Sequence, residues 1–529
     1  MIRIKLFKKF ISLYYAKKTV FIICFFVLAH FSCSHKPLKD PNAFVVATYD
    51  DVKDWDPATA FSLEVLPMSN MYEPLLWYDA GTSPGKFSPG LATSYSKSTD
   101  GLIWEFILRK NVLFHDGNEF NAETVKFVVE RNKKLNGGAS YIWSSVDKII
   151  VNSTHQITFV LSTPVPFDKI VSSQYGSWMY SPSIANISKD SLFNGYGAGT
   201  GPYQLKKWVR NKNIILEKFD KYWRGWEQKN HYSTVSIQVI AEASTRLQMI
   251  ESGLADYAIL IPSQLLKTLD DNPNVIVSHL DSWTNEFYML NTQKPPTNNI
   301  WFRRAIASSL DRKTLVKHVY KNTAKQAKGI IPQDMPLFQE PDSLLEFDLA
   351  IAKRYLKKSK INLENLKLNF SYVSTYEEYR LTAFMLLDNL KNIGIDLNLQ
   401  PGIWSTNWDK AKKFETSPNI ISMAWWPTVA SPSDWFFALY NSQKPTLFNL
   451  SYYSNSTVDS LTEKAWSLES TNPQLANSIY KKIQEILIND CVVIPAVDIK
   501  VPSVRRKNIN GLKENSAYST VFVYNLKYL

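Results

Sequence analysis

The segment 425–435 holds the side chains best suited to binding a ligand. Its sequence, Trp-Trp-Pro-Thr-Val-Ala-Ser-Pro-Ser-Asp-Trp, places Trp425 and Trp426 together in a stretch whose prolines predict a loop. Aromatic rings on a loop can form the wall of a cleft and contact apolar side chains or sugar faces. The alternative is that one ring packs in the core while the other covers the loop. We expect at least one of these two rings to face a cleft.

Catalytic and metal-binding patterns are missing from the sequence. There is no Gly-x-Ser-x-Gly turn, no His-Glu-x-x-His and no group of Cys and His residues at metal-ligand spacing. The chain has seven histidines, which leaves few groups for acid–base chemistry. A catalytic triad assembled from distant residues stays open, so a hydrolase is the rival interpretation. We expect no enzymatic activity, no cofactor and no bound metal.

The first 33 residues have the pattern of a signal peptide. Six basic side chains and no acidic one precede the apolar run 20–28, which is too short for a membrane-spanning helix of about 20 residues. Cys33 followed by Ser34 resembles the cleavage site of a bacterial lipoprotein, although His30 stands where such sites carry Leu or a similar residue. We expect export and a lipid on Cys33. Ordinary cleavage and an uncleaved anchor are the alternatives.

Charge and cysteine content exclude some classes of protein. The formal net charge is +12, and removal of the six basic residues before Cys33 leaves about +6. The remaining lysines are scattered without a long basic run, so nucleic-acid binding is not supported. Cys491 stands beside an apolar run and is expected to be buried, so an internal disulfide is not expected if Cys33 is acylated. The mature chain is long enough for more than one domain.

Local patterns predict alternating strands and helices. The apolar run 104–108 predicts a buried strand, Gly117 a turn and Asn121 the cap of a helix. Later, the range 366–399 predicts a strand, a helix and a second strand, with Gly394 ending the helix. This order is typical of an α/β fold whose sheet is rich in parallel strands.

Several short motifs occur in the same order as in a known family. The segments 87–95, 108–117 and 122–125 resemble the signature of the extracellular solute-binding proteins, family 5, which serve peptide- and nickel-type ABC importers. The segments 199–203 and 244–256 continue this resemblance, which covers nearly the whole mature chain. It implies an α/β protein with a two-lobed periplasmic-binding-protein-like fold, of the large type II class with an extra inserted domain and a hinge between the lobes.

Two segments within the resemblance have a competing interpretation. His115 could be a metal ligand, but we expect a structural role for it. The glycine-rich segment 195–203 looks like a phosphate-binding loop, yet Pro202 and strand-like residues follow where a dinucleotide loop needs a helix. The resemblance implies instead that residues 199–203 are a crossing between domains.

The resemblance also implies a division of the mature chain. Lobe I is expected to contain residues 34–80, 200–284 and 500–529, and residues 81–199 are expected to form an inserted subdomain of that lobe. Lobe II is expected to contain residues 285–499. Proteins of this kind close on their ligand by a hinge motion at a few crossing residues.

The function implied by the resemblance is transport. We expect the substrate-binding component of an ABC importer, which captures an oligopeptide-like or other amphipathic solute between two lobes and delivers it to membrane permease subunits. We expect a monomer in the periplasm or on the outer face of the cytoplasmic membrane, anchored through a lipid on Cys33. An exported hydrolase, or an accessory chaperone or adhesin on the same fold, is the alternative.

The resemblance assigns further residues to the ligand cleft. Trp404 matches a position where the family often carries a cleft aromatic, and Trp408 follows it by one helical turn. Trp55 lies in the first cleft loop, while Trp283 and Asn285 lie at the crossing into lobe II. Each of these residues could instead serve packing.

Thr428 departs from the pattern of the peptide-binding members, which carry there an Asp that pairs with the α-ammonium group of the peptide. Because a threonine cannot form this charge-assisted pair, we expect a preference for solutes with a neutral or blocked end. Binding of a free amine stays open if an acid of the first cleft loop reaches the same place. The candidates are Asp50, Asp51, Asp54 and Asp56.

Overall fold

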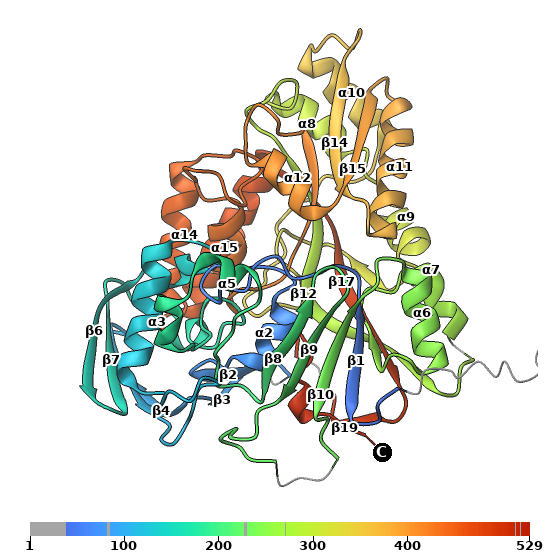
Figure 1. Cartoon of the computed structure of the whole chain (residues 1–529). Coiled ribbons are helices and arrows are strands. Elements are labelled where there is room, and N and C mark those ends of the chain that lie inside the picture. The colour runs from blue at the N-terminus through green and yellow to red at the C-terminus, as the bar shows by residue number, and fades with distance from the viewer. Residues whose placement is uncertain are drawn as a thin grey trace, which may run out of the picture. The chain divides into compact units, whose positions relative to one another are not determined.

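The computed structural model describes residues 39–81, 85–226, 230–269, 271–513, 515–518 and 520–528. The predicted signal peptide 1–33, with Cys33, lies outside these residues. Residues 42–529 form one compact unit of alternating strands and helices (Figure 1). No helix in the described ranges is long and apolar enough to cross a membrane.

The largest sheet has eleven strands. Its order is β15-β14-β16-β12-β17-β11-β1-β10-β9-β8, and β13 pairs with β17 beside this path. The strands are β1 (Ala43–Thr48), β8 (Tyr203–Val209), β9 (Asn213–Lys218), β10 (Thr234–Val239), β11 (Tyr257–Ala258), β12 (Val275–Leu290), β13 (Ala324–Gln326), β14 (Lys367–Val373), β15 (Asp396–Gly402), β16 (Ile420–Trp425) and β17 (Val493–Arg506).

The sheet is mixed rather than predominantly parallel. β1 is parallel to β10 and β11, and β14 is parallel to β15 and β16, as βαβ connections predict. β12 and β17, however, pair antiparallel with each other and with their outer neighbours. We call β1 and β8–β11 the first sheet half and β13–β16 the second sheet half. The expectation of a sheet rich in parallel strands is wrong at its centre and at the edge formed by β10, β9 and β8, which are also antiparallel.

β12 and β17 are long enough to belong to both sheet halves, and Figure 1 shows them side by side between the two. Their register shifts between Asp281 and Thr284, which divides the ladder into a part beside the first half and a part beside the second. A register shift of this kind bends a strand and increases its twist. The predicted crossing of the chain begins close to this point, at Ser282.

A separate four-stranded sheet lies within residues 92–161. It consists of β4 (Ala92–Lys97), β5 (Ile103–Leu108), β7 (Gln156–Leu161) and β6 (Val146–Ser153) in that order, all antiparallel. The helix α3 (Ala122–Leu135) begins at Asn121, whose side chain accepts a hydrogen bond from the Thr124 amide at 3.0 Å. The predicted strand 104–108 and the predicted cap are therefore confirmed. We call residues 92–161 the insertion.

The remaining elements cover the sheets or connect them. The helices are α2 (Val65–Met71), α4 (Phe167–Ile170), α5 (Lys189–Phe193), α6 (Ala243–Ser252), α7 (Ser263–Leu266), α8 (Ile300–Ala307), α9 (Arg312–Thr314), α10 (Leu349–Ser359), α11 (Glu377–Lys391), α12 (Trp404–Ala411), α13 (Ser433–Leu439), α14 (Ser456–Leu468) and α15 (Pro473–Asn489). Two small sheets pair β2 (Leu76–Asp79) with β3 (Lys86–Pro89), and β18 (Ile509–Asn510) with β19 (Lys527–Tyr528). The predicted strand–helix–strand over 366–399 is confirmed as β14, α11 and β15.

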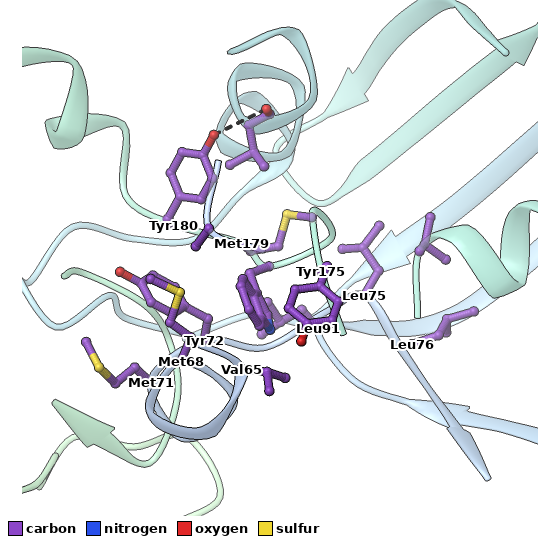
Figure 2. Close-up of a cluster of buried hydrophobic side chains, with 14 of the residues drawn as sticks. Val65, Met68, Met71, Tyr72, Leu75, Leu76, Leu91, Tyr175, Met179 and Tyr180 are labelled. Atoms are coloured by element: carbon purple, nitrogen blue, oxygen red, sulfur yellow. Dashed lines mark hydrogen bonds between the residues drawn. The ribbon is translucent and has the colours of Figure 1, made fainter. Parts of the chain in front are cut away.

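The short helix α2 is buried on all sides. Val65, Met68 and Met71 belong to the same apolar cluster as Tyr175 and Met179, which come from the chain after the insertion (Figure 2). Full burial of these side chains provides about 1.5–3 kcal/mol each. Because α2 directly follows residues 49–64, this cluster fixes the end of that loop.

The glycine-rich segment is a close backbone contact rather than a phosphate loop. It leads into strand β8, not into a helix, and the Gly201 amide donates to the Met71 carbonyl at 2.9 Å. A Cβ atom on Gly199 would lie 1.9 Å from the Met71 carbonyl oxygen. Only glycine allows the two backbones to approach this closely.

His115 serves this same contact. Its Nε2 donates to the Gly201 carbonyl at 2.9 Å, and its Nδ1 accepts from the Gly199 amide at 3.3 Å. Burial lowers the pKa of His115 to about 4, so the ring is neutral at pH 7. Both ring nitrogens are occupied within the protein, which fits the predicted structural role.

A methyl group at Gly199 tests this contact. We expect Gly199→Ala to lower the free energy of unfolding by about 3 kcal/mol, because the new Cβ atom must displace backbone. Gly81→Ala is the control, since its Cβ would meet only the end of the Asp79 side chain at 3.2 Å. Urea unfolding of both variants gives the comparison. Equal stability of the two variants would contradict the assignment.

Candidate functional site

A cavity of about 330 Å³ lies between the loop 49–64 and the second sheet half. Its walls come from that loop, from the start of α11, from α12, from the end of β16 and from residues 447–448. The lining residues are Tyr49, Asp50, Asp51, Lys53, Asp54, Thr59, Phe61, Ser62, Leu63, Glu64, Gly138, Val373, Thr375, Tyr376, Tyr379, Ile403, Trp404, Ser405, Trp408, Ser422, Met423, Ala424, Trp425, Trp426, Leu447 and Phe448.

A continuous series of aromatic rings forms one wall of the cavity. Trp404 stacks on Trp408 with ring centroids 6.3 Å apart, and Trp408 stacks on Phe448 at 5.3 Å. Phe448 meets Trp425 edge to face at 5.1 Å, and Phe61 lies 5.2 Å from Phe448. We call these five residues the aromatic wall. Such a surface can bury the apolar part of a solute.

Strand register and one buried carboxylate hold Trp425 in this wall. Trp425 ends β16 opposite Asn285 of β12. Its indole Nε1 donates to Asp434 Oδ2 at 3.0 Å, and the Thr428 amide donates to the same oxygen at 2.8 Å. The Tyr141 hydroxyl donates to Asp434 Oδ1 at 2.6 Å. Asp434 therefore joins the segment 425–428 to the insertion.

Asp434 is fully buried and has no cationic partner in these contacts. Burial raises the pKa of its carboxyl from the ordinary value of 3.8 to about 6, although the three hydrogen bonds oppose that rise. Its oxygens are occupied by protein donors, and Asp434 does not line the cavity. It is a structural group behind the wall.

The same loop makes further contacts with residues 169–175. The Trp426 indole donates to the Tyr175 hydroxyl at 3.0 Å, and the Gln174 amide donates to the Pro427 carbonyl at 2.7 Å. The Ser173 hydroxyl donates to the Thr428 carbonyl. These three bonds hold the segment 425–428 against residues 173–175.

Carboxylates form a second part of the cavity wall, and all of them come from the loop 49–64. Asp50, Asp51, Asp54 and Glu64 line the cavity together with one basic residue, Lys53. Lys53 pairs with Asp50 at 3.1 Å in a partly exposed position. The site therefore combines the carboxylates of this loop with the aromatic wall, of which only Phe61 comes from the same loop.

The loop that carries these carboxylates is held by contacts outside the cavity. Arg131 of α3 donates two hydrogen bonds, of 2.7 and 2.6 Å, to the two carboxylate oxygens of Asp56. Asp51 accepts from the Trp208 indole at 3.0 Å and from the Asn211 amide at 2.7 Å. A bidentate Arg–carboxylate pair fixes orientation as well as position. The loop is thus anchored to the insertion and to the first sheet half.

Three of the predicted site residues lie in the cavity wall: Trp404, Trp425 and Trp426. The structure places the other four behind it. Thr428 is only 2 % exposed, and its backbone amide donates to Asp434. Trp55 is buried edge to face against Trp208 at 5.5 Å.

Trp283 and Asn285 support the second sheet half. The Trp283 indole donates to the Asp334 carbonyl at 3.1 Å. The Asn285 side chain donates to the Ile330 carbonyl at 2.7 Å and accepts from the Trp435 indole at 3.0 Å. These contacts are the packing role that was the alternative for both residues, and neither residue lines the cavity.

Sequence reasoning missed several residues of the cavity. Phe448, Phe61 and Glu64 have no motif of their own, although Phe61 and Glu64 lie close to the predicted first cleft loop. Tyr376 lies within the predicted strand–helix–strand 366–399, directly before α11, and its hydroxyl bonds to that of Tyr49 at 2.6 Å. No local pattern marked it as a cavity residue.

The geometry suits binding better than catalysis. Within the described part of the chain, no three His, Cys, Asp or Glu side chains are grouped so that they could hold a metal ion. The cavity wall contains no histidine and no cysteine. Rings, hydroxyls and carboxylates remain, and these groups recognise a solute by shape, hydrogen bonds and charge.

A profile of the bacterial extracellular solute-binding proteins, family 5 (middle region), matches residues 86–446. The chain belongs to this family. The match spans the insertion, β12 and the Trp425 loop, so the family resemblance predicted from short motifs is confirmed.

Individual relatives of this family 5 protein are moderately similar. The probable D,D-dipeptide-binding periplasmic protein DdpA of Escherichia coli is 26% identical over 441 residues, covering 82% of this chain and 84% of the relative. The glutathione-binding protein GsiB of Salmonella choleraesuis is 27% identical over 434 residues, covering 80% and 82%. The periplasmic binding protein DppA of Helicobacter pylori, solved with the peptide STSA, superposes with a TM-score of 0.83 at 24% identity, covering 92% and 98%. The two-lobed periplasmic-binding-protein fold is thereby confirmed.

Asp434 should make the protein less stable as the pH rises from about 4 to about 6. The folded carboxyl keeps its proton up to about pH 6, whereas the unfolded one loses it near 3.8, so the folded state binds more protons in this window. Between pH 4 and 6 we expect the stability of wild type to fall relative to Asp434→Asn by up to about 3 kcal/mol. Urea unfolding at several pH values measures this.

Two features separate this effect from a general loss of stability. The asparagine also loses an acceptor, which shifts the variant by an amount independent of pH. Asp147→Asn, at an exposed position on β6, is the matched control and should follow wild type. A constant difference between wild type and Asp434→Asn over the whole range would contradict the assignment.

Proposed function

We propose that the protein is the substrate-binding component of an ABC importer, and that it captures a small peptide-like or other amphipathic solute between its two lobes. The observation that carries this proposal is the cavity between the loop 49–64 and the second sheet half, which is lined by the aromatic wall and by carboxylates. Family membership supports the transport role, since the family is one of extracellular solute-binding proteins.

The size of the cavity and the names of the relatives support this class of solute. A volume of about 330 Å³ is at the lower end of the range for small-molecule pockets. DdpA and GsiB are named for a dipeptide and for glutathione, and DppA was solved with a tetrapeptide. The aromatic wall would take the apolar part of such a solute. Ligand contact by Trp404, Trp425 and Trp426 is part of the proposal.

The proposal includes closure of the two lobes around the solute. The hinge would lie where β12 and β17 change register, between Asp281 and Thr284. The Tyr49–Tyr376 bond and a bond from the Ser263 amide to Glu378 at 2.9 Å would form on closure, because they join residues of the two sheet halves. The domain boundaries given above from the sequence remain part of this proposal.

The remaining parts concern location and partners. Relatives named as periplasmic support export, and the cysteine at position 33 motivates a lipid anchor at the membrane. Delivery to permease subunits by a monomer without enzymatic activity follows from the importer role. A hydrolase would instead turn over its substrate, and a chaperone or adhesin would bind protein without a small solute.

Closure can be measured by small-angle X-ray scattering. A peptide-like solute at about 100 times its dissociation constant should reduce the radius of gyration and raise the stability by about 2.7 kcal/mol. Trp404→Ala is the control, because it removes one end of the aromatic wall and should weaken both effects. Tight binding without compaction would contradict closure, and turnover of the solute would favour the hydrolase.

Anchoring can be tested through Cys33. A lipidated cysteine should hold the protein to membranes, because two or more acyl chains bind far more stably than one. We expect Cys33→Ala to move the protein to the soluble fraction or to block processing, while Cys24→Ala leaves it unchanged. Fractionation and the intact mass measure the outcome. Membrane retention of Cys33→Ala at an unchanged mass would contradict lipidation.

A further inference from the structure

The charges that line the cavity are unbalanced. Four carboxylates and one ammonium group belong to its wall, and its lining residues include no arginine or histidine. The single ammonium group, that of Lys53, already pairs with Asp50. A solute that enters this cavity therefore meets an excess of negative charge on the side of the loop 49–64.

Most of the carboxylate oxygens are already occupied by protein donors. Both oxygens of Asp51 accept bonds from the Trp208 indole, and the Asn211 amide also donates to one of them. In Asp54, one oxygen accepts from the Asp56 amide at 2.9 Å and the other from the Thr59 hydroxyl at 2.6 Å. These groups hold the loop in shape.

Glu64 differs from Asp51 and Asp54 because only one of its oxygens is occupied, and it differs from Asp50 because it is almost completely buried. Oε1 accepts from the Lys53 amide at 2.9 Å and from the Asp54 amide at 3.3 Å. Oε2 is buried and has no hydrogen-bond partner among the described residues, although the residue is only 3 % exposed and lines the cavity. A buried acceptor without a donor is unfavourable by about 1–3 kcal/mol, and more when it is charged.

The surroundings of Glu64 favour a cationic donor. No basic side chain bonds to its carboxylate. Burial raises the pKa of both Glu64 and Asp54, and Arg131 opposes that rise only at Asp54. A positively charged group that entered the cavity would stabilise the ionised carboxylates. The rings of the aromatic wall would add to the attraction, since aromatic faces attract cations.

We propose that the cavity binds a solute with a cationic nitrogen, an ammonium or guanidinium group, and that Glu64 Oε2 accepts a charge-assisted hydrogen bond from it. The aromatic wall then packs against the apolar part of the same solute. This inference rests on the proposed function and names the chemical class of its ligand.

The proposal changes the expectation drawn from Thr428. Thr428 lies behind the wall and carries no charge, so the side of Trp425 has no anion for an amine. The negative charge lies instead on the loop 49–64. The sequence offered four aspartates of this loop as partners for a free amine. Asp50, Asp51 and Asp54 line the cavity, whereas Asp56 is bound to Arg131. Glu64, in the same loop, is a buried acid with an unpartnered oxygen.

The test uses matched pairs of solutes that differ in one charge. Two pairs are suitable: Ala-Phe-amide with N-acetyl-Ala-Phe-amide, and arginine-containing with citrulline-containing dipeptide amides. Calorimetry gives the affinity of wild type and of Glu64→Gln for each member. Glutamine retains an oxygen for the Lys53 and Asp54 amides, so it removes the charge with little change in shape. Glu463→Gln, an exposed position on α14, is the matched control.

We expect wild type and Glu64→Gln to differ only for the cationic members. In wild type, the cationic member of at least one pair should bind at least about tenfold more tightly than its neutral partner, and Glu64→Gln should remove this difference. Equal binding within both pairs, or a preference that survives in Glu64→Gln, would overturn the role of Glu64. If neutral members bind and compact the protein, the proposed function stands without this inference. If no member binds at millimolar concentration, both proposals fail for peptide-like solutes.

Discussion

The antiparallel ladder of β12 and β17 is the constraint on which the site depends. β12 and β17 pair with each other and border both sheet halves. The register between these two strands therefore sets the position of one sheet half relative to the other. Asn285 of β12 stands opposite Trp425, which sets how far β16 extends before the Trp-Trp loop begins. The ladder shifts register between Asp281 and Thr284, close to where the halves diverge. A shift there lets the strands bend without the loss of the remaining ladder bonds.

Different contacts hold the aromatic wall and the loop 49–64 in place. The aromatic wall is fixed from behind by Asp434, which joins Trp425 and Thr428 to Tyr141 of the insertion. The acidic loop is fixed by the Asp56–Arg131 pair and by the bonds of Asp51. Side chains ordered before binding lose less conformational entropy when the solute arrives. With both supports rigid, the motion expected of the site is that of the loop 49–64 relative to the second sheet half.

Local patterns predicted the elements well, and distant contacts account for most of what they missed. The Asn121 cap, the strand 104–108 and the strand–helix–strand over 366–399 depend on neighbouring residues, which the sequence displays directly. Family motifs supplied the fold. The antiparallel centre of the sheet did not follow from any local pattern, because the partner of β12 lies about two hundred residues later in the chain. Trp283 and Trp425 look alike in sequence, yet only the second lines the cavity.

The contrast between Asp434 and Glu64 shows why residue type alone could not locate the charge of the site. Both are buried carboxylates near the cavity, and burial raises the pKa of each. Asp434 has three protein donors shared over its two oxygens, so it is satisfied and structural. Glu64 has its donors on one oxygen, and the other oxygen is buried without a partner. A buried acceptor without a donor is unfavourable, and a donor from outside the chain would complete it. The neutral Thr428 therefore does not make the cavity neutral, because carboxylates of the loop 49–64 line it.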